Sequence, residues 1–163
     1  MGKRWHKFDH IGIIVKDLDK SMEFYRKVFG FELPKTGPYN RVIQSRGHKY
    51  CLISAKGEGE EEVFIEFFDV AFDPESQRVM NLLGGDGAVV ELCVAVDNIE
   101  AWYDEMKMKG YTPVGNLSGQ PLTTEKYALS PAGSRYFYLL PSETGQQYWI
   151  EILERPGDPY RKH

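Results

Sequence analysis

Cysteine is scarce in this sequence of 163 residues, and there is no excess of basic side chains. Cys51 and Cys93 form no Cys-x-x-Cys motif, which argues against a zinc knuckle and against a redox dithiol. Both cysteines stand within apolar runs, and we interpret them as reduced thiols of the core. The formal net charge of −4 leaves no basic stripe for nucleic-acid phosphates.

Long hydrophobic runs are also missing. No apolar run approaches the roughly 20 residues that a membrane span needs. Residues 1–7 are basic, but no apolar stretch follows them, so they do not read as a secretory signal. We therefore expect a cytoplasmic protein that binds neither membranes nor nucleic acid. Apolar residues make up 42% of the chain, which is enough for a folded core.

The first part of the chain predicts a strand followed by a helix. Residues 8–15 form a short apolar run with β-branched side chains, which is typical of a strand. Apolar positions then recur at spacings of four, three and four from Leu18 to Phe29, which places them on one face of a helix. Gly30 follows as the residue that ends this helix.

The same pattern returns later in the chain. Residues 88–96 predict a strand, and the apolar positions between Ile99 and Met106 predict a helix that ends at Gly110. The nine-residue stretch that begins at His10 aligns without a gap with the stretch that begins at Glu91. The alignment predicts two similar modules.

Each predicted helix is followed by short strand-like runs. These are residues 39–46, 48–54 and 62–68 in the first half, and residues 111–117, 125–130, 135–140 and 147–153 in the second. The order βαβββ therefore occurs twice, which predicts an α+β fold whose two modules form a curved mixed sheet around a cleft. We expect a single domain over 1–163, with modules at 7–68 and 88–154, a linker at 69–87 with a short helix at 74–83, and a tail at 155–163.

Four ionisable residues occupy equivalent places in the two predicted modules. Side chains alternate along a strand, so His10 and Glu91 each lie opposite the bulky apolar face of an opening strand. Glu66 and Glu151 hold the same place in the closing strands. A pseudo-symmetric fold would bring the four together, and three neighbouring carboxylates repel one another unless a proton or a cation compensates their charge.

A divalent cation bound by His10, Glu66, Glu91 and Glu151 resolves this repulsion. The oxygen-rich set suits manganese, iron, cobalt, nickel or magnesium at least as well as zinc. The alternative is that all four are solvated residues on exposed faces of the sheet. Their mirrored positions inside apolar runs favour the metal-binding interpretation.

About residues 7–154 resemble the vicinal oxygen chelate superfamily, also called the glyoxalase/bleomycin-resistance/extradiol-dioxygenase family. His10-Ile-Gly-Ile-Ile-Val-Lys-Asp-Leu-Asp looks like the opening of its first module, and Val94-Ala-Val-Asp-Asn-Ile-Glu like that of its second. The family places metal ligands at the positions of His10, Glu66, Glu91 and Glu151. Asp73-Pro-Glu-Ser and Leu140-Pro-Ser-Glu-Thr-Gly-Gln are most similar to methylmalonyl-CoA epimerases.

The chain departs from the patterns of the families that it resembles at Glu91, at Glu66 and in residues 39–48. The second-module ligand is usually histidine, and here it is Glu91. Epimerases usually have glutamine at the position of Glu66, and in this respect the chain is closer to glyoxalase I. Epimerases also carry a separate carboxylate base, at a position that corresponds to residues 39–48 of this chain. This sequence has no acid there. His48 is an alternative base, but a histidine at the start of a strand is more often solvent-facing, and we favour that interpretation.

The resemblance implies a metal-dependent isomerase or epimerase that acts on a carbon acid next to a carbonyl group. Glu91 or Glu66 is the expected base, and the expected cofactor is one manganese, cobalt, nickel, iron or zinc ion. Expected partners are a small-molecule substrate such as an acyl-CoA or a glutathione adduct, and a second copy of the chain in a homodimer. The alternatives are a glyoxalase-I-like lyase and a non-catalytic small-molecule binding protein, although the family's drug-resistance members lack the metal ligands.

Overall fold

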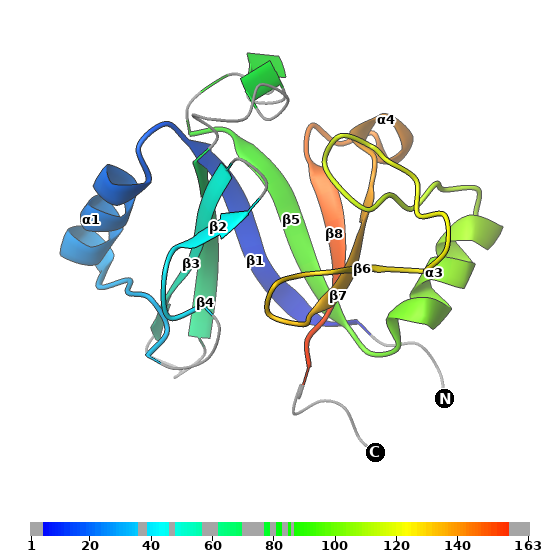
Figure 1. Cartoon of the computed structure of the whole chain (residues 1–163), viewed down its shortest axis with the longest axis horizontal. Helices are drawn as coiled ribbons and strands as arrows, with labels where there is room; N and C mark the ends of the chain where they lie inside the picture. The colour runs from blue at the N-terminus through cyan, green and yellow to red at the C-terminus, as the bar shows by residue number, and fades with distance from the viewer. Residues whose placement is uncertain are drawn as a thin grey trace. The chain divides into compact units, whose positions relative to one another are not determined.

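The computed structural model describes residues 5–35, 39–45, 48–56, 62–69, 77–78, 81–82, 85 and 87–156. The elements follow one another along the chain (Figure 1) as β1 (Trp5–Val15), α1 (Leu18–Phe29), β2 (Ile43–Ser45), β3 (His48–Lys56), β4 (Glu62–Asp69), β5 (Val89–Val96), α3 (Ile99–Met108), β6 (Ala128–Leu129), β7 (Arg135–Leu139), α4 (Pro141–Thr144) and β8 (Trp149–Glu154). The order βαβββ occurs twice, apart from the short α4, so the predicted α+β class is confirmed.

The chain divides into two compact units. His10–Val90 form one, named here the N-terminal unit, and Met1–Asp9 with Glu91–His163 form the other, named the C-terminal unit. Strand β1 contributes to both units, because the division falls between Asp9 and His10. Each unit is described by itself below.

The N-terminal unit contains strands in the order β2-β3-β4-β1. β1 and β4 run parallel, whereas β3 is antiparallel to both β2 and β4. Helix α1 begins where the Asp17 carboxylate accepts a hydrogen bond from the Lys20 N–H at 2.9 Å, and it ends at Gly30 with φ of 74°. One face of these strands packs with α1 around a cluster of Val15, Leu18, Cys51, Ile53, Ile65 and Phe67.

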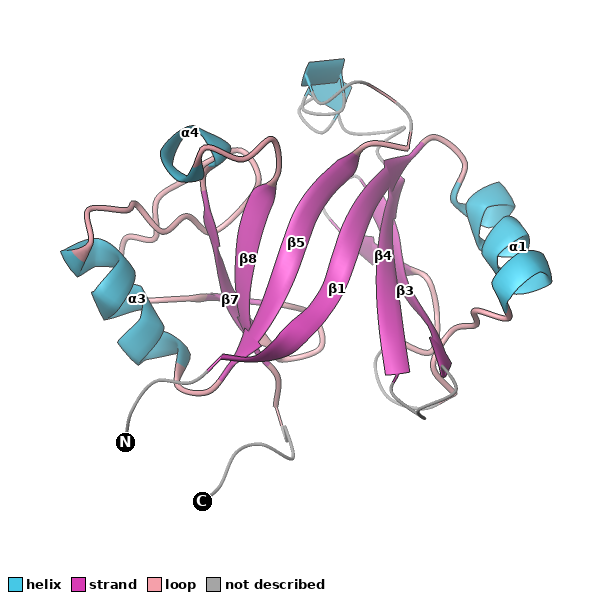
Figure 2. Ribbon diagram, turned by 180° about the vertical axis from the view of Figure 1, so that it is seen from behind, coloured by secondary structure: helices cyan, strands magenta, loops and turns pink. Residues whose placement is uncertain are grey.

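The C-terminal unit contains strands in the order β1-β5-β8-β7-β6. β5 and β8 run parallel, and β7 is antiparallel to both of its neighbours. Helix α3 lies along β7 and β8 (Figure 2), where it packs around a cluster of Val96, Ile99, Met106, Phe137, Leu139 and Ile152. Asn98 caps this helix through its side chain, which accepts a hydrogen bond from the Ala101 N–H at 3.2 Å.

The prediction of a strand at 111–117 is wrong. Only Val114 pairs there, through isolated bridges to Tyr138 and Pro121. Pro113 has no N–H to extend a ladder, and the chain turns back directly afterwards, where the Gly115 N–H donates to the Gln120 carbonyl at 2.8 Å. The run predicted at 125–130 shrinks to the two-residue strand β6.

Two other expectations are only partly within the described residues. Of the helix predicted at 74–83, residues 77–78 and 81–82 are helical, and the others lie outside the described residues. Of the predicted tail at 155–163, only Arg155 and Pro156 are described. Among the parts of the chain that the structure describes, no helix is both long and apolar enough to cross a membrane.

Candidate functional site

The N-terminal unit places His10 and Glu66 on the same face of its sheet. The register pairs His10 with Phe64 and Gly12 with Glu66 on the parallel strands β1 and β4. Neighbours in such a register point to the same side, so this face is opposite the one that packs against α1. The alternation predicted for these two strands is therefore confirmed.

His10 and Glu66 are in direct contact. Nε2 of His10 lies 2.9 Å from Oε2 of Glu66, and their side chains are only 4% and 13% exposed. Gly12, two positions after His10 on β1, is the residue that pairs with Glu66 across the register. An imidazole nitrogen and a carboxylate oxygen are both common ligands of a divalent cation.

The C-terminal unit holds a second pair at the equivalent positions. Glu91 on β5 is 0% exposed, and Glu151 on the neighbouring strand β8 is 6% exposed. A carboxylate oxygen of Glu91 and one of Glu151 lie within 4.8 Å of each other. Burial of two neighbouring carboxylates is costly unless a proton or a cation reduces their repulsion.

The sheet register explains why these two glutamates meet. Glu91 pairs with Trp149 and Cys93 pairs with Glu151, so all four side chains share one face of β5 and β8. The opposite face of the same strands carries residues of the cluster under α3. This division into a helix-covered face and a face with carboxylates was predicted from alternation along the strands.

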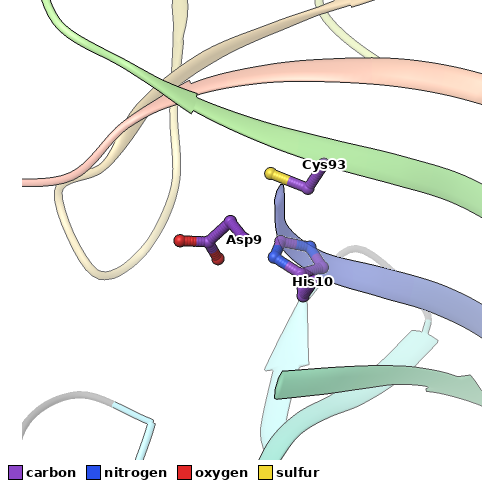
Figure 3. Close-up of side chains that lie close together, drawn as sticks. All are labelled: Asp9, His10 and Cys93. Carbon is purple, nitrogen blue, oxygen red and sulfur yellow. The ribbon is translucent and has the colours of Figure 1, made fainter. Parts of the chain in front are cut away.

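Asp9 lies on the same unit and was missed from the sequence. Its carboxylate and the Cys93 thiol come from β1 and β5 and lie within 4.8 Å of each other (Figure 3). Arg155 Nε donates to Asp9 Oδ2 at 2.8 Å, and Arg155 Nη2 donates to Asp9 Oδ1. The guanidinium of Arg155 compensates the charge of the Asp9 carboxylate through these two hydrogen bonds.

Asp9 anchors a residue that was predicted to lie in the polar tail. Arg155 directly follows β8, and its bidentate contact with a buried carboxylate attaches that point of the chain to β1. No local motif marks this pair, because the two residues are 146 positions apart. The one sequence signal for this contact is that Asp9 is an acidic residue within the apolar run of the first strand.

A second buried anchor fixes the end of β8. Arg135 Nη2 donates to both carboxylate oxygens of Glu154, at 2.7 and 2.6 Å, and Glu154 Oε2 also accepts the Ile99 N–H at 2.9 Å. Burial alone would lower the pKa of Arg135, but the hydrogen bonds and charge of Glu154 outweigh it and raise the pKa. The contact joins the first turn of α3 to the strand that carries Glu151.

Cys51 and Cys93 are buried and form no disulfide bond, as predicted. Burial, with a smaller contribution from the negative charge of Glu66, raises the pKa of the Cys51 thiol to about 12. A thiol with such a pKa stays neutral near pH 7 and does not act as a nucleophile. The side chain of His48, the alternative base, is not among those that the structure describes.

A family model matches most of the chain. The model of the Glyoxalase/Bleomycin resistance protein/Dioxygenase superfamily matches residues 7–136. The match covers the first module and a large part of the second.

Curated relatives are distant in sequence. The uncharacterized protein YwbC of Bacillus subtilis (strain 168) is 25% identical over 149 residues, which span 91% of this chain and 98% of that protein. A lactoylglutathione lyase of Schizosaccharomyces pombe is 25% identical over 163 residues, and the match spans 92% of this chain but only 48% of the lyase. The chain therefore corresponds to about half of that enzyme.

Solved structures share the fold. A Streptomyces coelicolor methylmalonyl-CoA epimerase in complex with 2-nitronate-propionyl-CoA superposes with a TM-score of 0.71 at 19% identity. The superposition covers 94% of this chain and 100% of the epimerase chain. At this level of identity the likeness establishes the fold alone.

Proposed function

Because the chain belongs to the Glyoxalase/Bleomycin resistance protein/Dioxygenase superfamily, we propose that it is a metal-dependent isomerase acting on a carbon acid next to a carbonyl group. The proposal rests on one observation: each of the two modules has a pair of potential metal ligands, and the two pairs occupy equivalent positions. His10 and Glu66 are 2.9 Å apart in the N-terminal unit. Glu91 and Glu151 lie within 4.8 Å of each other in the C-terminal unit.

The four residues are proposed to bind one divalent cation. Their donor set of one imidazole and three carboxylates fits manganese, cobalt, nickel, iron or zinc. All four side chains are on the faces opposite those that pack against α1 and α3, and three of them are buried. When bound, such a cation supplies positive charge beside a substrate carbonyl, which lowers the cost of removing the adjacent proton.

Glu91 is the proposed base that removes and returns that proton. A carboxylate suits this role when it is near the reacting carbon and shielded from water, and Glu91 is 0% exposed. Glu66 is the second candidate, but its Oε2 is already in contact with His10. No acidic residue occurs in 39–48, so that segment offers no other carboxylate.

An acyl-CoA thioester is the first substrate class to test. The epimerase with the similar fold was solved with 2-nitronate-propionyl-CoA, and the hydrogen next to a thioester carbonyl is acidic enough for a carboxylate base. A glutathione adduct, processed by a lyase reaction, is the second class. The lactoylglutathione lyase relative supports it, as does Glu66, which stands where epimerases usually have glutamine.

The proposal is tested by proton exchange. The purified protein is stripped of metal, reloaded with each of the five metals, and incubated with methylmalonyl-CoA in heavy water. We expect deuterium to enter the carbon between the two carbonyl groups only in metal-loaded samples. The exposed Glu125 provides a control variant, because Glu125→Gln leaves all four proposed ligands in place and is expected to exchange like the wild type.

Two results would contradict the proposal. One is exchange at equal rates in metal-free and metal-loaded protein, which would remove the cation from the reaction. The other is tight binding of methylmalonyl-CoA or S-lactoylglutathione without exchange, isomerisation or cleavage at any metal, which would favour a binding protein.

A further inference from the structure

Trp149 opens strand β8 on the face that carries the proposed metal ligands. It pairs with Glu91 in the parallel register of β5 and β8, and it precedes Glu151 by two positions on its own strand. Residues in these relationships point to the same side of a sheet. The indole is therefore a neighbour of both glutamates of the C-terminal unit.

The indole nitrogen of Trp149 is a buried donor without an acceptor. Its Nε1 atom is inaccessible to solvent and makes no hydrogen bond to any of the described residues. Buried polar groups almost always have a partner, and each exception needs an explanation. The indole N–H is a donor only, so neither a change of protonation nor a change of tautomer removes the need for an acceptor.

We propose that the Trp149 N–H donates a hydrogen bond to an oxygen atom of the substrate. The inference rests on the proposed function and assigns this residue a role in choosing the substrate. A carbonyl or carboxylate oxygen beside Glu91 would satisfy the buried donor. A substrate without that oxygen would leave the donor unsatisfied, so the site selects acyl compounds that carry an acceptor next to the acidic carbon.

The hydrogen bond also assists the reaction itself. When Glu91 removes the proton, negative charge develops on the adjacent carbonyl oxygen. A fixed donor in a water-excluded site stabilises this charge more than it stabilises the neutral carbonyl. Loss of the N–H is therefore expected to lower kcat as well as to weaken substrate binding.

The variant Trp149→Phe separates the N–H from the aromatic ring. We expect kcat/KM for deuterium exchange into methylmalonyl-CoA to fall about tenfold, with unchanged metal content. The matched control is Trp102→Phe. It removes an indole N–H from α3, where Trp102 packs against the cluster on the opposite face of the sheet, and it is expected to leave kcat/KM unchanged. Equal kcat/KM in Trp149→Phe and wild type would overturn the inference while leaving the proposed function intact.

A direct readout does not depend on turnover. The chain has three tryptophans, so 15N-labelled protein gives three indole signals, and the signal lost in Trp149→Phe identifies Trp149. We expect that signal to move downfield when methylmalonyl-CoA or S-lactoylglutathione is added to the metal-loaded protein. An unmoved indole signal while backbone amides report binding refutes the hydrogen bond. Failure of both probes to bind, together with absent exchange, refutes the proposed function and the inference with it.

Discussion

At the scale of single residues, the proposed metal ligands are ionisable side chains, which are costly to bury. Glu91, Glu151 and His10 are at most 6% exposed, although ionisable side chains are seldom buried so deeply. Glu91 is the most informative of them, because it occupies the position that matches His10 in the repeat. A carboxylate there adds a negative charge to the ligand set and also provides a base.

The variant Glu91→His tests whether Glu91 is the base. Histidine replaces one ligand by another, so we expect metal content to remain at about one ion per chain. Proton exchange into methylmalonyl-CoA should fall at least about a hundredfold, which is typical when a general base is lost. Glu91→Gln should weaken both properties, because an amide is a poor ligand and a poor base. If Glu91→His exchanges as fast as wild type, the base lies elsewhere, with Glu66 and His48 next.

Cys51 gives a prediction for the pH dependence of stability. Burial raises the pKa of its thiol from 9.0 to about 12, so the folded state holds the proton more tightly than the unfolded state. This contribution is fully present below pH 9 and is lost as pH rises toward 12, because the unfolded thiol then ionises first. The loss is at most about 1.4 kcal/mol per pH unit.

Urea unfolding at pH 8 and pH 10.5 measures this effect. We expect the free energy of unfolding to fall more steeply with pH in the wild type than in Cys51→Ala, which lacks the ionising group. Parallel pH profiles of the two proteins would show that Cys51 does not contribute.

At the scale of elements, β8 is fixed by hydrogen bonds to the strands on both of its sides and by side-chain contacts at its last residue. It pairs with β5 and β7, and Glu154 at its last position binds Arg135 of β7 and the first turn of α3. The strand that presents Trp149 and Glu151 is thereby fixed in register. The contacts of Glu154, on the opposite face of the sheet, therefore help to fix the positions of Trp149 and Glu151.

The variant Glu154→Ala tests this anchor. It removes the acceptor of the Ile99 N–H and leaves Arg135 without its bidentate partner, so we expect a loss of about 3 kcal/mol in the free energy of unfolding. Glu100→Ala is the control, since Glu100 is exposed and lies 3.4 Å from Arg135. Equal stabilities of the two variants in urea would show that the Glu154 contacts do not anchor the strand.

At the scale of the whole molecule, one module occurs twice with altered chemistry in each copy. The first copy offers a histidine and a glutamate, and the second offers two glutamates. The proposed cation would draw ligands from both copies, so metal binding would contribute to the stability of the whole chain. A ligand that binds only the folded state adds about 2.7 kcal/mol at a concentration of one hundred times its Kd.

The variant Glu151→Ala measures this contribution. We expect stoichiometric metal to be lost in elemental analysis, and the Tm in excess metal to fall by about 5–10 °C relative to the wild type. In the presence of a chelator the two proteins should differ much less. The exposed control Glu125→Ala should match the wild type in both conditions, and unchanged metal content in Glu151→Ala would refute its assignment as a ligand.

The sequence alone determined the repeat, the α+β class and the faces of the strands. These features are local, because alternation with a period of two and helical spacing are read from consecutive residues. Alternation along the strands accordingly predicts the faces that carry His10, Glu66, Glu91 and Glu151, and the strand registers agree. Their joint binding of one metal stays a prediction.

Only the tertiary structure decided which distant residues meet. The Asp9–Arg155 pair joins positions 146 residues apart, and the Ile99–Glu154 hydrogen bond joins positions 55 apart. Neither pair has a periodic signal, because contacts of this kind depend on where strands end after pairing. The surroundings of the Trp149 indole N–H, which has no acceptor among the described residues, likewise depend on the pairing of β8 with β5.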